Sequence, residues 1–255
     1  MDSDDKKISE LTIGTPVLTD LMPYVSNPTT SPETKASYVG NVYLEGWSPV
    51  VLTWTYASAT TITVASGASS LYQKGDKVRF KQGGGYKYGY LVTVADTLLT
   101  FFGGSDYSVA NSAITDVAIS RVENPFGFPL QFNWAASITN LTQGNGVLTA
   151  KCKMNGSLVT GRVEFVFGST SSMGSVPTLV LPITVATYGA ITPIGISRMK
   201  DATGGNAATG GILTNGIFIV YNGSGTYDVG DTLSSTVPFT WAVSDQLSAS
   251  FSYFA

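Results

Sequence analysis

Strict alternation of apolar and polar residues near the C-terminal end of this chain constrains its fold more than any other feature of the sequence. Residues 246–253 read Gln-Leu-Ser-Ala-Ser-Phe-Ser-Tyr, so every second side chain is apolar. Because successive side chains of a β-strand point to opposite faces of the sheet, this pattern is typical of a strand with one buried face and one solvated face. The sequence therefore predicts a half-buried strand here.

A β-hairpin is predicted upstream, around an Asn-Gly pair. Residues 148–154 alternate between apolar and polar up to Asn155-Gly156, and the alternation resumes over residues 162–167. Asn-Gly between two such segments favours a tight type I′ turn. The returning strand is expected to bury its aromatic side chains and to place Arg162 and Glu164 in water.

Short strand signals continue through the rest of this half, separated by Gly, Pro, Asn and Ser clusters that favour turns. The segments are Leu179–Leu181, Ile191–Ile196, Ile217–Tyr221 and Phe239–Val243. Many short strands without a long amphipathic helix are typical of a sandwich or a jelly roll. We therefore predict an all-β protein in which residues 130–255 form a jelly-roll-like β-sandwich head.

A smaller antiparallel β domain is predicted over residues 46–123. Its strand signals lie at Thr61–Val64, Lys77–Phe80, Tyr86–Val94, Leu98–Phe102 and Ile114–Val122. In residues 77–81 basic residues alternate with Val78 and Phe80, which predicts a basic, solvent-facing side. Two prolines around a glycine in residues 124–129 interrupt both ladders, so this segment is expected to be a stiff hinge.

Several motifs of the C-terminal half form a familiar set. They are Asn140-Leu141-Thr142, Gly144-Asn145-Gly146, Phe167-Gly168-Ser169-Thr170-Ser171, Leu181-Pro182, Thr192-Pro193-Ile194-Gly195 and Ser235–Trp241. Their order resembles the C-terminal β-sandwich heads of tailed-bacteriophage fibre and minor structural proteins, and residues 54–100 resemble a module of such minor structural proteins. These motifs are structural, so the resemblance implies a virion protein, commonly a homotrimer, without naming its target.

Residues 1–45 are expected to form an extended arm that docks on other virion proteins. The Lys-Ile-Ser-Glu-Leu and Leu-Met-Pro-Tyr-Val segments look like the N-terminal segments of phage fibre proteins, which implies docking on the capsid, collar or tail. The residues expected to dock are Ile8, Leu11, Leu18, Leu21, Met22 and Tyr24. The alternative is a strap across the chain's own middle domain.

Charge and hydropathy bear on partners and location. Charged residues make up 12% of the chain, against roughly 25% in ordinary globular proteins, which favours partial burial in an assembly. The net charge is −3 and the 14 basic residues are scattered along the sequence, which argues against binding to nucleic acid. No run approaches the 18 or so apolar residues of a membrane span, and no apolar core follows the charged start as in a secretory signal. The expected location is the virion, after synthesis in the host cytoplasm.

The sequence offers little catalytic or metal-binding chemistry. It contains no histidine and one cysteine, which removes Ser-His-Asp catalysis and thiolate metal clusters. Cys152 lies on the apolar side of its expected strand, so we expect a small buried residue, with an interchain bond or a reactive thiol as alternatives.

Two clusters of side chains with oxygen atoms are candidate sites. Asp96, Asp106, Asp116 and Glu123 could converge like the carboxylate pair of a glycosidase, but each stands where a turn or a solvated strand face would place an acid. Asn222, Asp228 and Asp231 could surround calcium but lack the ligand spacing of an EF-hand. The sequence predicts no enzyme activity, no cofactor and no metal site.

Binding by shape is the remaining class of function. We expect a trimeric fibre-type adhesin whose head binds bacterial surface glycan, with tyrosine and tryptophan rings available for stacking. The alternative is a head fibre or a decoration subunit of the capsid or tail with a mainly structural role, which the absence of a repeating shaft favours.

Overall fold

The computed structural model describes residues 21–26, 33–38, 45–50, 52–186, 191–223 and 228–255. Regular structure in these ranges is β apart from one helical turn, α2 (Ala68–Leu71), and the strands pair antiparallel. The all-β prediction is confirmed. No helix among these residues is long and apolar enough to cross a membrane.

The chain folds into two compact units. One comprises the described residues of Met1–Ser48 with Ser120–Phe128, and the other comprises those of Pro49–Ile119 with Pro129–Ala255. Most of the predicted hinge therefore belongs to the first unit, while the bulk of the domains predicted on its two sides belongs to the second.

The first unit contains a hairpin inside the predicted arm. Strand β1 (Leu21–Ser26) pairs antiparallel with β2 (Glu33–Tyr38). In the same unit, the Trp47 Nε1 donates to the Phe126 carbonyl oxygen at 2.8 Å, and the Trp47 ring lies 6.0 Å from that of Phe128. The predicted hinge segment is thus held against Trp47, and its role as a stiff hinge stays a prediction.

The second unit begins with the predicted small β domain, here called the middle module. Its strands are β3 (Ser48–Pro49), β4 (Thr55–Ser58), β5 (Thr61–Thr63), β6 (Lys77–Gln82), β7 (Gly85–Val94), β8 (Leu98–Phe102) and β9 (Thr115–Ser120). The described strands follow the order β3-β9-β6-β7-β8-β5-β4 in one sheet. Its core packs around Trp54, Ile62, Phe80 and Leu99, which are almost fully buried.

The basic side predicted for β6 is wrong in part. The register places Lys77, Arg79 and Lys81 opposite three tyrosines of β7. Lys77 is buried and Arg79 is half-buried beneath the Tyr86 ring, while Lys81 is exposed. The pattern within one strand could not show this, because large side chains on a neighbouring strand cover residues on the same face of a sheet.

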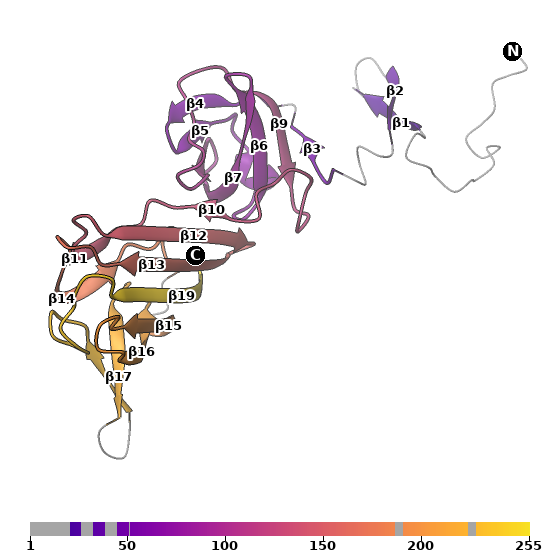
Figure 1. Cartoon of the computed structure of the whole chain (residues 1–255). Helices are drawn as coiled ribbons and strands as arrows, with labels where there is room; N and C mark the ends of the chain where they lie inside the picture. Colours follow the sequence, from indigo (N-terminus) through magenta and orange to yellow (C-terminus); the bar gives the residue numbers. More distant parts are fainter. Residues whose placement is uncertain (1–20, 27–32, 39–44, 51, 187–190, 224–227) are drawn as a thin grey trace, which may run out of the picture. The chain divides into compact units, whose positions relative to one another are not determined.

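The head forms from the remaining strands (Figure 1). They are β10 (Phe132–Asn133), β11 (Ile138–Thr142), β12 (Val147–Asn155), β13 (Leu158–Val166), β14 (Ser172–Leu179), β15 (Pro193–Lys200), β16 (Ala207–Leu213), β17 (Phe218–Gly223), β18 (Asp228–Thr232) and β19 (Gln246–Phe254). The larger sheet has the order β10-β12-β13-β19-β15-β16-β17-β18 among the described strands, and β11 pairs with β14 separately. The sandwich-like all-β head is confirmed, and the jelly-roll connectivity stays a prediction.

The alternating C-terminal segment is a central strand of this sheet. Strand β19 lies between β13 and β15, and it pairs with β13 along its whole length and with β15 over residues 246–251. Its odd-numbered side chains, including Leu247 and Phe251, are buried, as the alternation predicts. They pack in a core with Phe165, Met199 and Ile212, each almost fully buried.

The predicted hairpin is confirmed, but its turn differs. Asn155 pairs with Leu158, so the two loop residues are Gly156 and Ser157. Gly156 has φ of 57° and Ser157 has no positive φ, whereas a type I′ turn requires positive φ at both central residues. The pattern is that of type II′, in which glycine takes the first central position.

The strand predicted at Phe239–Val243 is wrong. This segment is irregular, and the Trp241 ring stacks on Phe167 with the ring centroids 4.8 Å apart. The Asp245 carboxylate accepts a hydrogen bond from the backbone of Ala242 at 2.6 Å and closes a turn there. Such a side-chain acceptor offers the backbone an alternative to a sheet ladder.

Candidate functional site

Four adjacent head strands carry many polar side chains on their solvent side, beside the exposed apolar Val147, Ile196 and Phe254, and we call these polar side chains the outer face. Each of its residues alternates with a buried residue, so the period that builds the core also builds this face. The outer face comprises Thr149, Lys151 and Lys153 of β12, Thr160, Arg162 and Glu164 of β13, Gln246, Ser248, Ser250 and Ser252 of β19, and Arg198 and Lys200 of β15.

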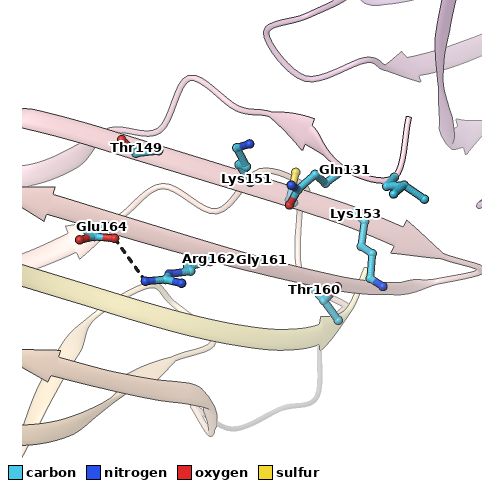
Figure 2. Close-up of a pocket in the computed structure, with 10 residues that line it drawn as sticks. Gln131, Thr149, Lys151, Lys153, Thr160, Gly161, Arg162 and Glu164 are labelled. Atoms are coloured by element: carbon cyan, nitrogen blue, oxygen red, sulfur yellow. Dashed lines mark hydrogen bonds and ion pairs between the residues drawn. The ribbon is translucent and has the colours of Figure 1, made fainter. Parts of the chain in front are cut away.

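Two adjoining hollows lie on the outer face and share Arg162 and Glu164. The larger, of about 600 Å³, lies over β12 and β13 and extends to Leu130 and Gln131 (Figure 2). The smaller, of about 140 Å³, continues over β19 and β15 to Lys200. Together they form a continuous hollowed surface to which both charged residues of β13, Arg162 and Glu164, contribute.

The outer face carries an excess of positive charge. Its one ion pair between described residues joins Arg162 Nη2 to Glu164 Oε2 at 3.3 Å, and both side chains remain partly exposed. Arg162 also stands directly opposite Lys151 in the β12–β13 register. Like charges in directly opposed positions destabilise a sheet, so the folded chain gains nothing from this pair by itself.

Acidic residues in the loops beside this face are engaged elsewhere. The buried Asp245 carboxylate accepts hydrogen bonds from the backbone of Ala202 at 2.8 Å and of Ala242 at 2.6 Å. The hydrogen bond from the Gly204 amide is the main cause that lowers the pKa of Asp201. Both carboxylates hold loops and do not pair with the lysines of the outer face.

A row of tyrosines on β7 forms a second surface. Tyr86 lies 6.3 Å from Tyr88, and Tyr88 lies 5.8 Å from Tyr107, both measured between ring centroids. Tyr86 is 39% exposed, and its hydroxyl donates to Asp116, which raises the pKa of Tyr86. The Arg79 Cζ atom lies over the Tyr86 ring, 5.2 Å from its centroid, so Arg79 covers part of that ring.

The inner end of this tyrosine row is structural. The buried Phe132 of β10 lies 5.4 Å from Tyr90 and 6.2 Å from Tyr107. Beside it, the Asp106 carboxylate accepts hydrogen bonds from the Asn133 backbone at 2.7 Å and from its side-chain amide at 2.8 Å. These residues join the middle module to the head within the second unit.

The other acids considered from the sequence have separate partners. Asp96 accepts from the Gly67 amide at 2.7 Å, Asp116 accepts from Tyr86, and Glu123 is exposed. Among the described residues no group of three or more Cys, Asp or Glu side chains is placed to hold a metal ion. Of the residues considered for calcium, the side chains of Asn222 and Asp228 lie outside the described residues.

Cys152 is buried in the head core, as the sequence predicts. Burial raises the pKa of its thiol to about 12. The thiolate is therefore scarce at neutral pH, which argues against the reactive-thiol alternative.

The predicted docking residues remain untested. Ile8, Leu11 and Leu18 lie outside the described residues, while Leu21, Met22 and Tyr24 fall in β1. Docking through them stays a prediction.

The sequence reasoning does not predict the outer face, although part of the pattern that forms it can be recognised in the sequence. Lys151 and Lys153 alternate with buried residues, and so do Arg198 and Lys200. The argument that the basic residues are scattered is wrong for this face, because five of the chain's 14 basic residues gather on it. Only the adjacency of β13, β19 and β15 brings them together.

Comparison with known proteins yields no match to a family model, a curated protein or a solved structure.

Proposed function

We propose that this chain is a fibre-type structural protein of a tailed bacteriophage, a homotrimer whose heads bind glycan on the bacterial surface. The outer face carries the proposal. It presents hydroxyl, amide and charged groups over two adjoining hollows, while most of the large apolar side chains of the same strands, such as Phe165 and Phe251, face the core. Closely spaced donors and acceptors on a rigid sheet suit a polyhydroxylated ligand.

Assembly into a trimer is supported by the exposed apolar side chains and by the sparse charge. Leu130 is 79% exposed and Ile191 is 62% exposed in the isolated chain, and charged residues make up 12% of it. Contact with a second copy of the chain would remove such side chains from water. Three linked heads would raise avidity by roughly 10² to 10⁴ over one head.

The N-terminal arm supplies the attachment to the particle in this proposal. Its partners are other virion proteins of the capsid, collar or tail, and the proposed role needs neither catalysis nor membrane insertion. The resemblance of residues 124–255 to phage fibre heads supports the same placement.

The virion role is tested by antibody labelling of particles made from the genome that encodes the chain. Gold label at the tail end is expected for the adhesin, and the purified full chain should compete with those particles for adsorption to susceptible cells. Particles without label would overturn the virion role. Label spread over the capsid, with no competition, would instead establish the decoration subunit as the function.

The trimer is tested by light scattering of the purified full chain. A mass near three times 26.8 kDa is expected. A monomer at micromolar concentration would remove the avidity mechanism.

A further inference from the structure

We propose that the outer face of the head binds an anionic polysaccharide through carboxylate or phosphate groups on the polymer. This inference rests on the proposed function for the source of the polymer, the bacterial surface. The location and the charge of the ligand rest on the sheet itself.

The first step is the local reversal of charge. The whole chain has 17 acidic and 14 basic residues, yet the outer face holds five basic residues and one acidic residue. Within the described part of the chain, its lysines and Arg198 form no ion pair, and Glu164 already pairs with Arg162. An anionic partner would complement this surface.

The second step is the opposed pair at its centre. Lys151 and Arg162 face each other across β12 and β13, both exposed, and both line the larger hollow. Such a pair costs stability in the free protein. One anion between the two cations would pair with both. Binding of the anion would therefore relieve the repulsion that destabilises the free protein.

The third step is the spacing of the positive groups. Lys151 and Lys153 lie on β12, and Arg198 and Lys200 lie on β15, three strand spacings away in the same sheet. Three spacings correspond to about 14 Å between backbones. Between the two basic clusters lie β13, with Arg162 and Glu164, and β19, with Gln246 and Ser248. A polymer with repeated charges can reach both clusters, whereas a single small anion cannot.

The fourth step is the choice of a glycan over a nucleic acid. Single-stranded nucleic acids are usually bound by rows of aromatic side chains on which bases stack. On the described outward positions of β12, β13, β15 and β19 the one ring is Phe254, which lies at the end of the face and is 51% exposed. The other aromatic rings of these strands, such as Phe251, are buried in the core. Hydroxyl and amide side chains instead suit the hydroxyl groups of a sugar polymer.

The experiment measures binding of the full chain to three immobilised polysaccharides: polygalacturonate for carboxylate, a phosphomannan for phosphate, and neutral dextran. Binding to at least one anionic polymer is expected, with no binding to dextran. Affinity should fall by about tenfold or more as the salt concentration rises from about 0.05 to about 0.5 M, because exposed charges are then screened. The two anionic polymers distinguish carboxylate from phosphate as the recognised group.

Substitutions then locate the site. Lys151→Gln combined with Arg198→Gln removes one charge from each basic cluster and should weaken the Kd by about 10- to 100-fold. The matched control combines Lys74→Gln with Lys81→Gln, which removes the same net charge from exposed positions of the middle module. The control should change the Kd by less than about twofold, and circular dichroism should show all variants folded.

Three outcomes would overturn the inference. Equal losses in the two double variants would mean that net charge and not the outer face decides binding. Equal binding to dextran would remove the requirement for anions, and tighter binding to a 20-nucleotide thymidine oligomer than to either anionic polymer would replace the glycan by nucleic acid. If the chain bound neither anionic polymer but gold label were present on the particles, this inference would be wrong and the proposed virion role would stand. If the chain bound an anionic polymer but the particles carried no label, the proposed function alone would be refuted.

Discussion

Replacement of Gly161 by alanine is the most informative perturbation of the head, because two physical effects predict opposite signs. Gly161 lies inside β13, between the partner residues Cys152 and Phe251 of the neighbouring strands. An alanine Cβ there would come within 2.6 Å of Phe251 Cε2, well inside contact distance. The Phe251 ring is itself confined, with Trp134 5.9 Å away and Tyr253 5.9 Å away between ring centroids.

The magnitude follows from the competition between backbone entropy and packing. Glycine inside a strand costs about 0.5–1 kcal/mol relative to alanine, so propensity by itself predicts that Gly161→Ala stabilises the protein. Overpacking in a close-packed core costs about 1–3 kcal/mol. Because the displaced ring is buried against Trp134, the cost of overpacking should exceed the gain in backbone entropy. The free energy of unfolding should therefore fall by about 1–2 kcal/mol. With a urea m value of about 3 kcal/mol/M, the midpoint should fall by about 0.3–0.7 M.

The assay is urea unfolding of the full chain followed by tryptophan fluorescence, to which Trp134 contributes from beside Phe251. Gly85→Ala is the matched control, because a Cβ at Gly85 meets no atom within 4 Å and its φ is not positive. The control should leave the midpoint unchanged or raise it. In the Gly161→Ala background, Phe251→Leu should cost less than it does in the parent chain, because it relieves the clash. If Gly161→Ala behaved like Gly85→Ala, the claim that Phe251 occupies this space would be refuted.

Three further outcomes are expected. Burial raises the pKa of the Cys152 thiol from 9.0 to about 12, so the folded state keeps a proton that the unfolded chain loses. The free energy of unfolding should therefore fall as the pH rises from about 9 toward 12. In Cys152→Ala the fall should be less steep. Asp245→Ala removes the buried acceptor of two backbone amides and should lower the free energy of unfolding, measured with urea, by about 2–4 kcal/mol. A decrease below about 0.5 kcal/mol would contradict this role. Lys151→Gln removes the like-charge neighbour of Arg162 and should raise the free energy of unfolding by about 0.2–0.5 kcal/mol at low salt, a gain that should vanish at about 0.5 M salt if its origin is electrostatic.

The sequence predicts local structure well where one strand's own alternation decides the result. The burial of Cys152 and Phe251 and the exposure of Arg162 follow from a two-residue period that no neighbour overrides. The same reasoning fails for Lys77, because tyrosines of β7 cover its face, and for Phe239–Val243, where the Asp245 carboxylate closes a turn. For Lys77 the deciding side chains lie on another strand, whereas Asp245 lies only two residues beyond the segment that it closes.

What the sequence by itself determined is which side of β12, β13 and β19 is buried, because alternation assigns their residues to one of two faces. What only the tertiary structure decided is which strands are neighbours. Strand β19 comes last in the chain yet lies between β13 and β15, and this placement joins the cations of residues 151–162 to those of residues 198–200 on one outer face. Strand pairing at such sequence separations depends on the packing of the whole core, and no local pattern encodes it.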